Sequence, residues 1–203
     1  AKKVFFMCPQ TPFYQSQLAS MKIAVEKAGG QIDSLVYDVK KPALRTEVDT
    51  ALRGQPDVIV LGGYTPDTSV LLKDLFRANF KGKLVGFGYS VNQKLVEALP
   101  ADVCEGIYTL SPSSDSSSLA YKRVVEITKT ASPDPYSCQI YDHVSMIVLA
   151  MASAKSTSGE AIREHIRRVS QGGGEKVESA LAGLKLLAAG KKIDYAGASG
   201  PCD

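Results

Sequence analysis

The sequence predicts an α/β protein, with a parallel, doubly wound sheet followed by a mainly helical second half. Short apolar runs end at Pro or Gly, and each leads into a segment whose apolar residues have helical spacing. This alternation repeats at intervals of roughly 25 residues, as in right-handed βαβ units. Beyond a serine-rich connector the strands almost disappear. We therefore expect an α/β lobe over residues 1–105 and a crossing strand with helices over residues 106–203.

The predicted strands of the first half cover residues 4–8, 32–39, 58–61, 83–87 and 107–110. Helices are expected after the loop 11–15, over 44–54, after Asp67 or Thr68, and over 92–99. The first helix should turn its apolar residues inward, namely Leu18, Met21, Ile23 and Val25. Gly29 and Gly30 stop this helix.

The stretch from Asp57 to Thr68 organises the rest of the lobe. Its apolar run reads as a strand that is buried on both faces. Gly62 and Gly63 end the strand, and Asp67 or Thr68 can cap the next helix. Open α/β sheets bind ligands where the chain leaves the carboxyl end of a parallel strand. The stretch therefore predicts a site that holds a small molecule.

The second half begins with the connector 111–118, and helices are expected over 119–130, 138–154, 159–170 and 177–189. Only residues 192–195 suggest a further strand. Since an amphipathic helix must bury its apolar stripe against another layer, we expect these helices to need a sheet that the chain does not supply.

Composition excludes several classes of function. The net charge of +3, with acids interleaved among the bases, does not indicate nucleic-acid binding. No apolar window of ~18 residues predicts a membrane span. The start of the chain does not resemble a signal peptide, as expected for a mature or cut protein. The spacing of the four cysteines does not indicate a zinc site. They allow three fully paired disulfide connectivities. Cys8 is expected to be a small buried apolar residue at the end of a strand.

No motif indicates catalysis, a metal or a cofactor. Gly172-Gly173-Gly174 joins two predicted helices, and so it indicates a flexible joint better than a phosphate loop. Asp142 and His143 are adjacent on a helix and point in different directions. His165 lies among arginines on a basic face, where a charged partner is the alternative to simple solvation.

Tyrosines follow three of the predicted strands. Tyr14 follows the first strand, Tyr64 the third and Tyr89 the fourth. The carboxyl ends of parallel strands share one edge of the sheet, and three aromatics there favour a concave, aromatic-walled pocket over surface decoration.

The chain resembles the type I periplasmic substrate-binding proteins of ABC importers, the leucine/isoleucine/valine-binding family. The segments that carry the resemblance are KVFF at residues 3–6, TPFY at 11–14, DVIVLGGY at 57–64, FKG at 80–82, EGIY at 105–108, YD at 141–142 and GASGP at 197–201. The resemblance implies two α/β lobes that close on a ligand like a hinge. It also implies that this chain is a fragment with the second lobe and the helices that return to an absent first lobe.

The resemblance also implies which residues contact the ligand. Tyr14 and Tyr64 match second-lobe contacts, and Tyr141 matches an apolar wall residue. The family's amino-acid binders carry a glutamate for the ligand's ammonium group, and Gly88, followed by Tyr89, stands at that position. A buried ammonium group without a carboxylate partner is costly. An aromatic or aliphatic carboxylate, or an amide, therefore fits this chain better than an α-amino acid.

The resemblance further implies a periplasmic location, a membrane permease as partner, and no catalysis or cofactor. An oxidising compartment would favour disulfides, such as Cys104 with Cys138, or Cys202 with a residue beyond the end. The alternative function is a ligand-sensing domain of a receptor or regulator with the same fold. The unpartnered helices predict self-association of the fragment.

Overall fold

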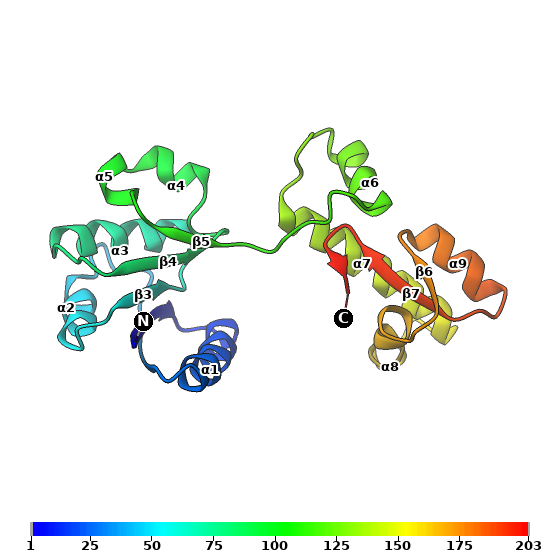
Figure 1. The fold of residues 1–203 in the computed structure, drawn as a ribbon, viewed down its shortest axis with the longest axis horizontal. Coiled ribbons are helices and arrows are strands. Elements are labelled where there is room, and N and C mark those ends of the chain that lie inside the picture. Colours follow the sequence, from blue (N-terminus) through cyan, green and yellow to red (C-terminus); the bar gives the residue numbers. More distant parts are fainter. Residues whose placement is uncertain (1, 203) are drawn as a thin grey trace. The chain divides into compact units, whose positions relative to one another are not determined.

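The computed structural model describes residues 2–202, which form two compact units (Figure 1). The first unit spans residues 1–111 and the second spans residues 112–203. The boundary between the two units falls within the loop at residues 111–115, which comes directly after strand β5. Each unit has its own sheet and its own apolar core.

The first unit is built on a parallel five-stranded sheet of order β2-β1-β3-β4-β5. Its strands are β1 (Lys3–Pro9), β2 (Gln31–Tyr37), β3 (Val58–Leu61), β4 (Lys83–Phe87) and β5 (Tyr108–Leu110). All pairings between neighbours are parallel. Every strand therefore ends at the same edge of the sheet, which we call the carboxyl edge. The predicted fold class is confirmed.

Helices cover both faces of this sheet (Figure 1). They are α1 (Pro12–Lys27), α2 (Arg45–Arg53), α3 (Thr65–Arg77), α4 (Gln93–Ala98) and α5 (Ala101–Cys104). Helix α1 packs on one face, through Leu18 and Met21 against Phe6 and Val60. The other helices pack on the opposite face in a larger core. Residues alternate between these two cores along β1, because successive side chains of a strand point to opposite faces.

Three local expectations for the first unit were wrong. Ile23 is 69% exposed, because α1 buries a narrow stripe that this residue does not join. Helix α3 begins at Thr65, before the expected caps, and Asp67 lies inside its first turn. Helix α5 was not expected, since its four residues give too short a pattern to detect.

The second unit combines helices with a small sheet. Its helices are α6 (Leu119–Thr128), α7 (Pro135–Ala154), α8 (Gly159–Ser170) and α9 (Ala180–Ala188). Its strands are β6 (Glu175–Val177), β7 (Ile193–Gly197) and β8 (Gly200–Pro201). Strand β7 pairs parallel with β6 and antiparallel with β8. The expectation of almost no strands was therefore wrong, since β7 is flanked by two short strands that lack alternating apolar residues.

A buried carboxylate holds the end of the second unit to α7. Asp142 is 1% exposed, and its Oδ1 accepts hydrogen bonds from the Tyr195 hydroxyl at 2.9 Å and the Ala198 N–H at 2.8 Å. Its Oδ2 accepts from the N–H and the hydroxyl of Ser199. A side chain at Gly197 would collide with this carboxylate. The sequence Asp142-His143 therefore has a structural role through its aspartate.

Helix α7 nevertheless leaves an apolar stripe uncovered by the residues of its own unit. The stripe consists of Ile140, Val144, Ile147 and Val148, which are between 37% and 62% exposed. Their spacing places them on one face of the helix. The second unit thus covers only part of the apolar surface of α7. The helix surface that was expected to lack a partner is found on this face.

The cysteines and the hydropathy of the helices complete the description. Within residues 2–202 no cysteine forms a disulfide, so the expected pairing of Cys104 with Cys138 is not present. Cys8 is buried, as expected, and burial raises the pKa of its thiol to about 11. Among the described helices none is both long and apolar enough to cross a membrane.

Candidate functional site

The carboxyl edge of the first unit brings three of the predicted tyrosines together. The ring centroids of Tyr14 and Tyr64 lie 6.1 Å apart, and those of Tyr64 and Tyr89 lie 5.6 Å apart. Tyr14 comes from the first turn of α1, and Tyr64 directly precedes α3. Tyr89 follows β4. Three turns that are distant in sequence thus form one cluster, as the shared edge of parallel strands requires.

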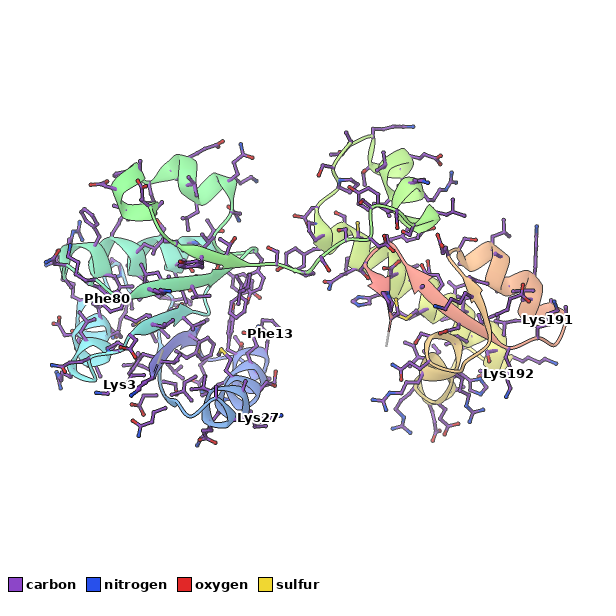
Figure 2. All side chains as sticks on the ribbon, viewed as in Figure 1. Lys3, Phe13, Lys27, Phe80, Lys191 and Lys192 are labelled. Carbon is purple, nitrogen blue, oxygen red and sulfur yellow. The ribbon has the colours of Figure 1, made fainter. Side chains whose placement is uncertain are left out.

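Two phenylalanines extend this cluster, and the sequence analysis did not single them out. The Phe13 ring lies 5.1 Å from that of Tyr14 and 6.3 Å from that of Tyr89. The Phe87 ring stacks on Tyr89 at 5.4 Å with an interplanar angle of 7°. Phe13 stands at the start of α1 (Figure 2). Phe13 directly precedes Tyr14 in the same strand-to-helix turn, and this position could have indicated that it joins the cluster.

The members of the aromatic cluster differ in exposure. Tyr64 is 54% exposed and Phe13 is 50% exposed, whereas Tyr14 is completely buried. Burial, followed by the neighbouring Tyr89 hydroxyl, raises the pKa of Tyr14, so its phenol stays protonated. Tyr14 is therefore the buried ring against which Tyr64 and Phe13 pack. Tyr64 and Phe13 expose aromatic surface to solvent.

The Gly62-Gly63 turn allows a buried carboxylate to reach the start of α3. Asp67 Oδ1 accepts the Tyr64 N–H at 3.1 Å, and Oδ2 accepts the Tyr37 hydroxyl at 2.5 Å. A Cβ atom on Gly63 would lie 2.0 Å from Asp67 Oδ2, and one on Gly62 would overlap the Phe6 ring. These glycines are needed for close approach, and the packing they allow sets the backbone that carries Tyr64.

A second set of hydrogen bonds ties the turn of Tyr89 to α3. Thr65 Oγ1 accepts from Asn92 Nδ2 at 3.0 Å and donates to the Ser90 carbonyl at 3.1 Å. Asn92 Nδ2 also donates to the Tyr89 carbonyl, while Asn92 Oδ1 caps α4 through the Leu95 N–H. The two loops that carry Tyr64 and Tyr89 are thus connected by side chains that were not predicted as part of the site.

Gly88 lies beside the aromatic cluster, next to the side chain of Ser111. Its N–H donates to the Leu110 carbonyl at 2.8 Å. A Cβ atom at this position would lie 1.9 Å from Ser111 Oγ. The chain therefore could not carry a glutamate here unless Ser111 moved.

A hollow of about 560 Å³ opens next to Tyr64 at the carboxyl ends of β1 and β2. Gln10 and Thr11 are polar residues of its lining, and Val36 and Val39 contribute apolar surface. Such a mixture is typical of small-molecule sites. Asp38 brings a carboxylate to this lining, and its Oδ1 accepts the Lys40 N–H at 2.9 Å.

The sequence profile of a family described as periplasmic binding proteins matches residues 1–195. The chain belongs to this family. Solved structures with a similar fold include a leucine-binding protein from Thermotoga maritima, at 22% identity and a TM-score of 0.67, covering 84% of this chain and 50% of that one. A fatty acid ABC transporter substrate-binding protein from Thermomonospora curvata has 20% identity and a TM-score of 0.62, with coverages of 84% and 46%.

A third solved structure with a similar fold is an amino acid ABC transporter substrate-binding protein from Pseudomonas fluorescens, with 20% identity and a TM-score of 0.58. The matched region covers 80% of this chain and 45% of the Pseudomonas fluorescens protein. The chain thus spans about half the length of these structures, and identities of this size establish the fold. No curated protein matches the sequence.

The remaining predicted residue of this binding-protein chain belongs to the other unit. Tyr141 lies on α7, half-buried against the small core of Ala120, Val124, Cys138 and Ala198. His165 is also in the second unit, where its Nδ1 lies 2.9 Å from Ser153 Oγ. Among residues 2–202 no three His, Cys, Asp or Glu side chains gather closely enough to hold a metal ion.

Proposed function

We propose that this chain is part of the extracytoplasmic solute-binding component of an ABC transporter. In this proposal the first unit is the second lobe of a two-lobed protein, and the aromatic cluster is its half of the ligand cleft. The observation that carries the proposal is the exposed aromatic surface of Tyr64 and Phe13 at the carboxyl edge of a chain from this family. The proposed partners are a small-molecule ligand and a membrane permease, and the proposed location is the periplasm.

The proposed ligand-site residues are Tyr14, Tyr64, Gly88 and Tyr89 from the first unit, with Tyr141 from the returning helix. Tyr64 offers a ring face and a hydroxyl group, and Tyr14 acts through its support of Tyr64. Aromatic side chains with a polar tip suit ligands that combine an apolar body with a polar end. Branched-chain amino-acid-like solutes, aromatic or aliphatic carboxylates, and amides belong to this class.

Gly88 favours the carboxylate and amide members of that class. The chain offers no acidic side chain at this position. Asp67 is already engaged by Tyr37 and Tyr64, so it has little capacity for a ligand ammonium group. Asp38, on the lining of the hollow, is the nearby carboxylate that an amine could still reach. A ligand screen should therefore include amino acids as well as acids and amides.

The alternative function is a ligand-sensing domain of a receptor or regulator. It would use the same cleft, and it would differ by fusion to a signalling or DNA-binding module. An enzyme is the least supported class, because the relatives named above are binding proteins. Turnover of a bound solute would contradict the transport proposal directly.

A ligand screen followed by a matched pair of variants tests the proposal. In the two-lobed protein, a true ligand should raise the melting temperature by mass action. Tyr64→Ala should then weaken its binding by about 2 kcal/mol or more, as loss of a central aromatic anchor does. Tyr108→Ala is the control, because Tyr108 is 56% exposed and stands at the start of β5, outside the cluster. Equal affinities of the two variants in calorimetry would refute the assigned site.

A further inference from the structure

A second cavity, in the other unit, collects features that the proposed transport function does not use. It has a volume of about 350 Å³ and lies where the ends of α7 and α8 meet the start of β7. Its polar lining comes from Ser153, His165, Arg168, Lys191 and Lys192. Figure 2 shows the two lysines at the turn between α9 and β7. Side chains from three separate segments thus converge on one space.

The charged side chains that line this cavity are all basic. None of its lining residues is an aspartate or a glutamate. Lys191 Nζ pairs with Glu175 Oε2 at 3.3 Å, but Arg168 and Lys192 make no ion pair within residues 2–202. Unpaired cations of this kind favour an anionic ligand.

The ordinary explanation for basic residues here is that they balance the negative ends of three helices. A helix C-terminus carries about half a negative charge. Ser153, Arg168 and Leu187 lie in the last turns of α7, α8 and α9, so the three helices contribute about one and a half negative charges together. Glu175 offsets Lys191. About half a positive charge therefore remains in excess, before any contribution from His165.

The contact between Ser153 and His165 orients one more donor. Ser153 Oγ lies 2.9 Å from His165 Nδ1. When the hydroxyl donates to Nδ1, the ring proton is on Nε2, which can then donate to an oxyanion. The Ser153 contact orients the imidazole ring before a ligand binds. Less conformational entropy of the His165 side chain is then lost on binding.

The glycine-rich turn removes side chains from one wall of the cavity. Gly172 contributes only backbone to the lining, and a Cβ atom on it would lie 2.2 Å from the Arg168 carbonyl oxygen. Gly173 has a φ of +65°, and a Cβ atom on Gly174 would overlap the start of β7. The turn is therefore closely packed against the end of α8 and the start of β7. Leu187 is the half-buried apolar residue of the lining, whereas Val169 and Ile193, which also line the cavity, are almost completely buried.

We propose that this cavity binds a small organic anion, with its phosphate or carboxylate group between Arg168, Lys192 and His165 and its apolar body against Leu187. The volume is near the lower end of the range of small-molecule sites. The site lies wholly within the second unit, so it is independent of the aromatic cluster and of the transport proposal. It could serve as a regulatory or auxiliary ligand site.

Titration of the 15N-labelled chain with phenyl phosphate tests this proposal. We expect saturable shifts of the Ser153, Gly172 and Lys192 amide resonances. Lys192→Gln and Arg168→Gln should each weaken binding by about tenfold, which is the effect of losing one charge-assisted hydrogen bond. Arg163→Gln is the matched control, because Arg163 is on the same helix, exposed, and paired with Glu160 outside the cavity.

Three results would overturn the proposal as a whole, and a fourth would contradict its apolar part. One is a titration without saturation. Another is an equal loss of affinity in Arg163→Gln, which would indicate attraction by net charge alone. The last is binding to phosphatidylglycerol vesicles without binding to phenyl phosphate. This result would indicate that the basic residues bind an anionic membrane surface and not a small molecule. Binding of inorganic phosphate as tightly as phenyl phosphate would contradict the apolar part of the site.

Discussion

The Tyr37 hydroxyl donates a hydrogen bond of 2.5 Å to Asp67 Oδ2, and the same carboxylate accepts the Tyr64 N–H through its other oxygen. This contact links the end of β2 to the start of α3. Both partners are buried. The exposed ring of Tyr64 is therefore positioned by two residues that a ligand on that ring would not need to touch.

Tyr37→Phe should lower the free energy of unfolding by about 2 kcal/mol, because it removes a buried hydrogen bond to a charged group. Burial raises the pKa of Tyr37. The loss should therefore be constant up to about pH 10, the ordinary tyrosine value. Above it, the wild type alone loses stability as Tyr37 ionises in the unfolded chain, so the difference should shrink.

Urea denaturation at several pH values measures this difference. Tyr108→Phe is the control, because the Tyr108 side chain is exposed. A Tyr37→Phe variant as stable as the control at neutral pH would show that the contact does not stabilise the fold.

Asp142→Asn should destabilise the second unit by about 3 kcal/mol. Four donors from Tyr195, Ala198 and Ser199 converge on the carboxylate, and an amide would place its own donor against one of them. Calorimetry of the variant should show a lower melting temperature for this unit. Glu160→Gln, at an exposed position of α8, should leave the transition unchanged. An unchanged transition in Asp142→Asn would show that the amide is accommodated.

Asp57 predicts an acid-dependent contribution to stability. Its Oδ2 accepts the N–H groups of Lys2 and Lys3, and these hydrogen bonds hold the pKa of Asp57 below its ordinary value of 3.8. A lowered pKa means that the contribution is present above that value and is lost as the pH falls below it. The stability difference between wild type and Asp57→Asn should therefore disappear in acid. Asp33→Asn, at an exposed position on β2, provides the comparison; a pH-independent difference for Asp57 would argue against this role.

The apolar stripe of α7 predicts self-association of this 203-residue chain. Ile140 and Val144 are more than half exposed and lie one helical turn apart, so a partner surface would bury them together. In the two-lobed protein the proposed partner of this face is the first lobe. Light scattering should detect a concentration-dependent increase in mass that Val144→Lys reduces. Ile23→Lys changes an isolated exposed residue and should have no effect; a monomer at all concentrations would contradict the prediction.

The local parts of the fold were predictable where the sequence carries a strong period. The run from Val58 to Leu61 is a buried strand, and the helix over 159–170 has the bounds expected from its spacing. Strand β6 was missed, because only one residue of its Glu175–Val177 segment is apolar and its pairing with β7 comes from contact with a distant segment. The contact between Tyr37 and Asp67 joins residues 30 positions apart, which no local pattern can indicate.

The sequence by itself determined that tyrosines follow three parallel strands, and hence that they share one edge of the sheet. Only the tertiary structure decided their exposure. Tyr14 is enclosed by Phe6 and Phe13, and Tyr64 lies on top of it with half of its surface open. The physical reason is that periodicity fixes where a side chain leaves the backbone, whereas burial depends on which neighbours other strands and helices bring to it.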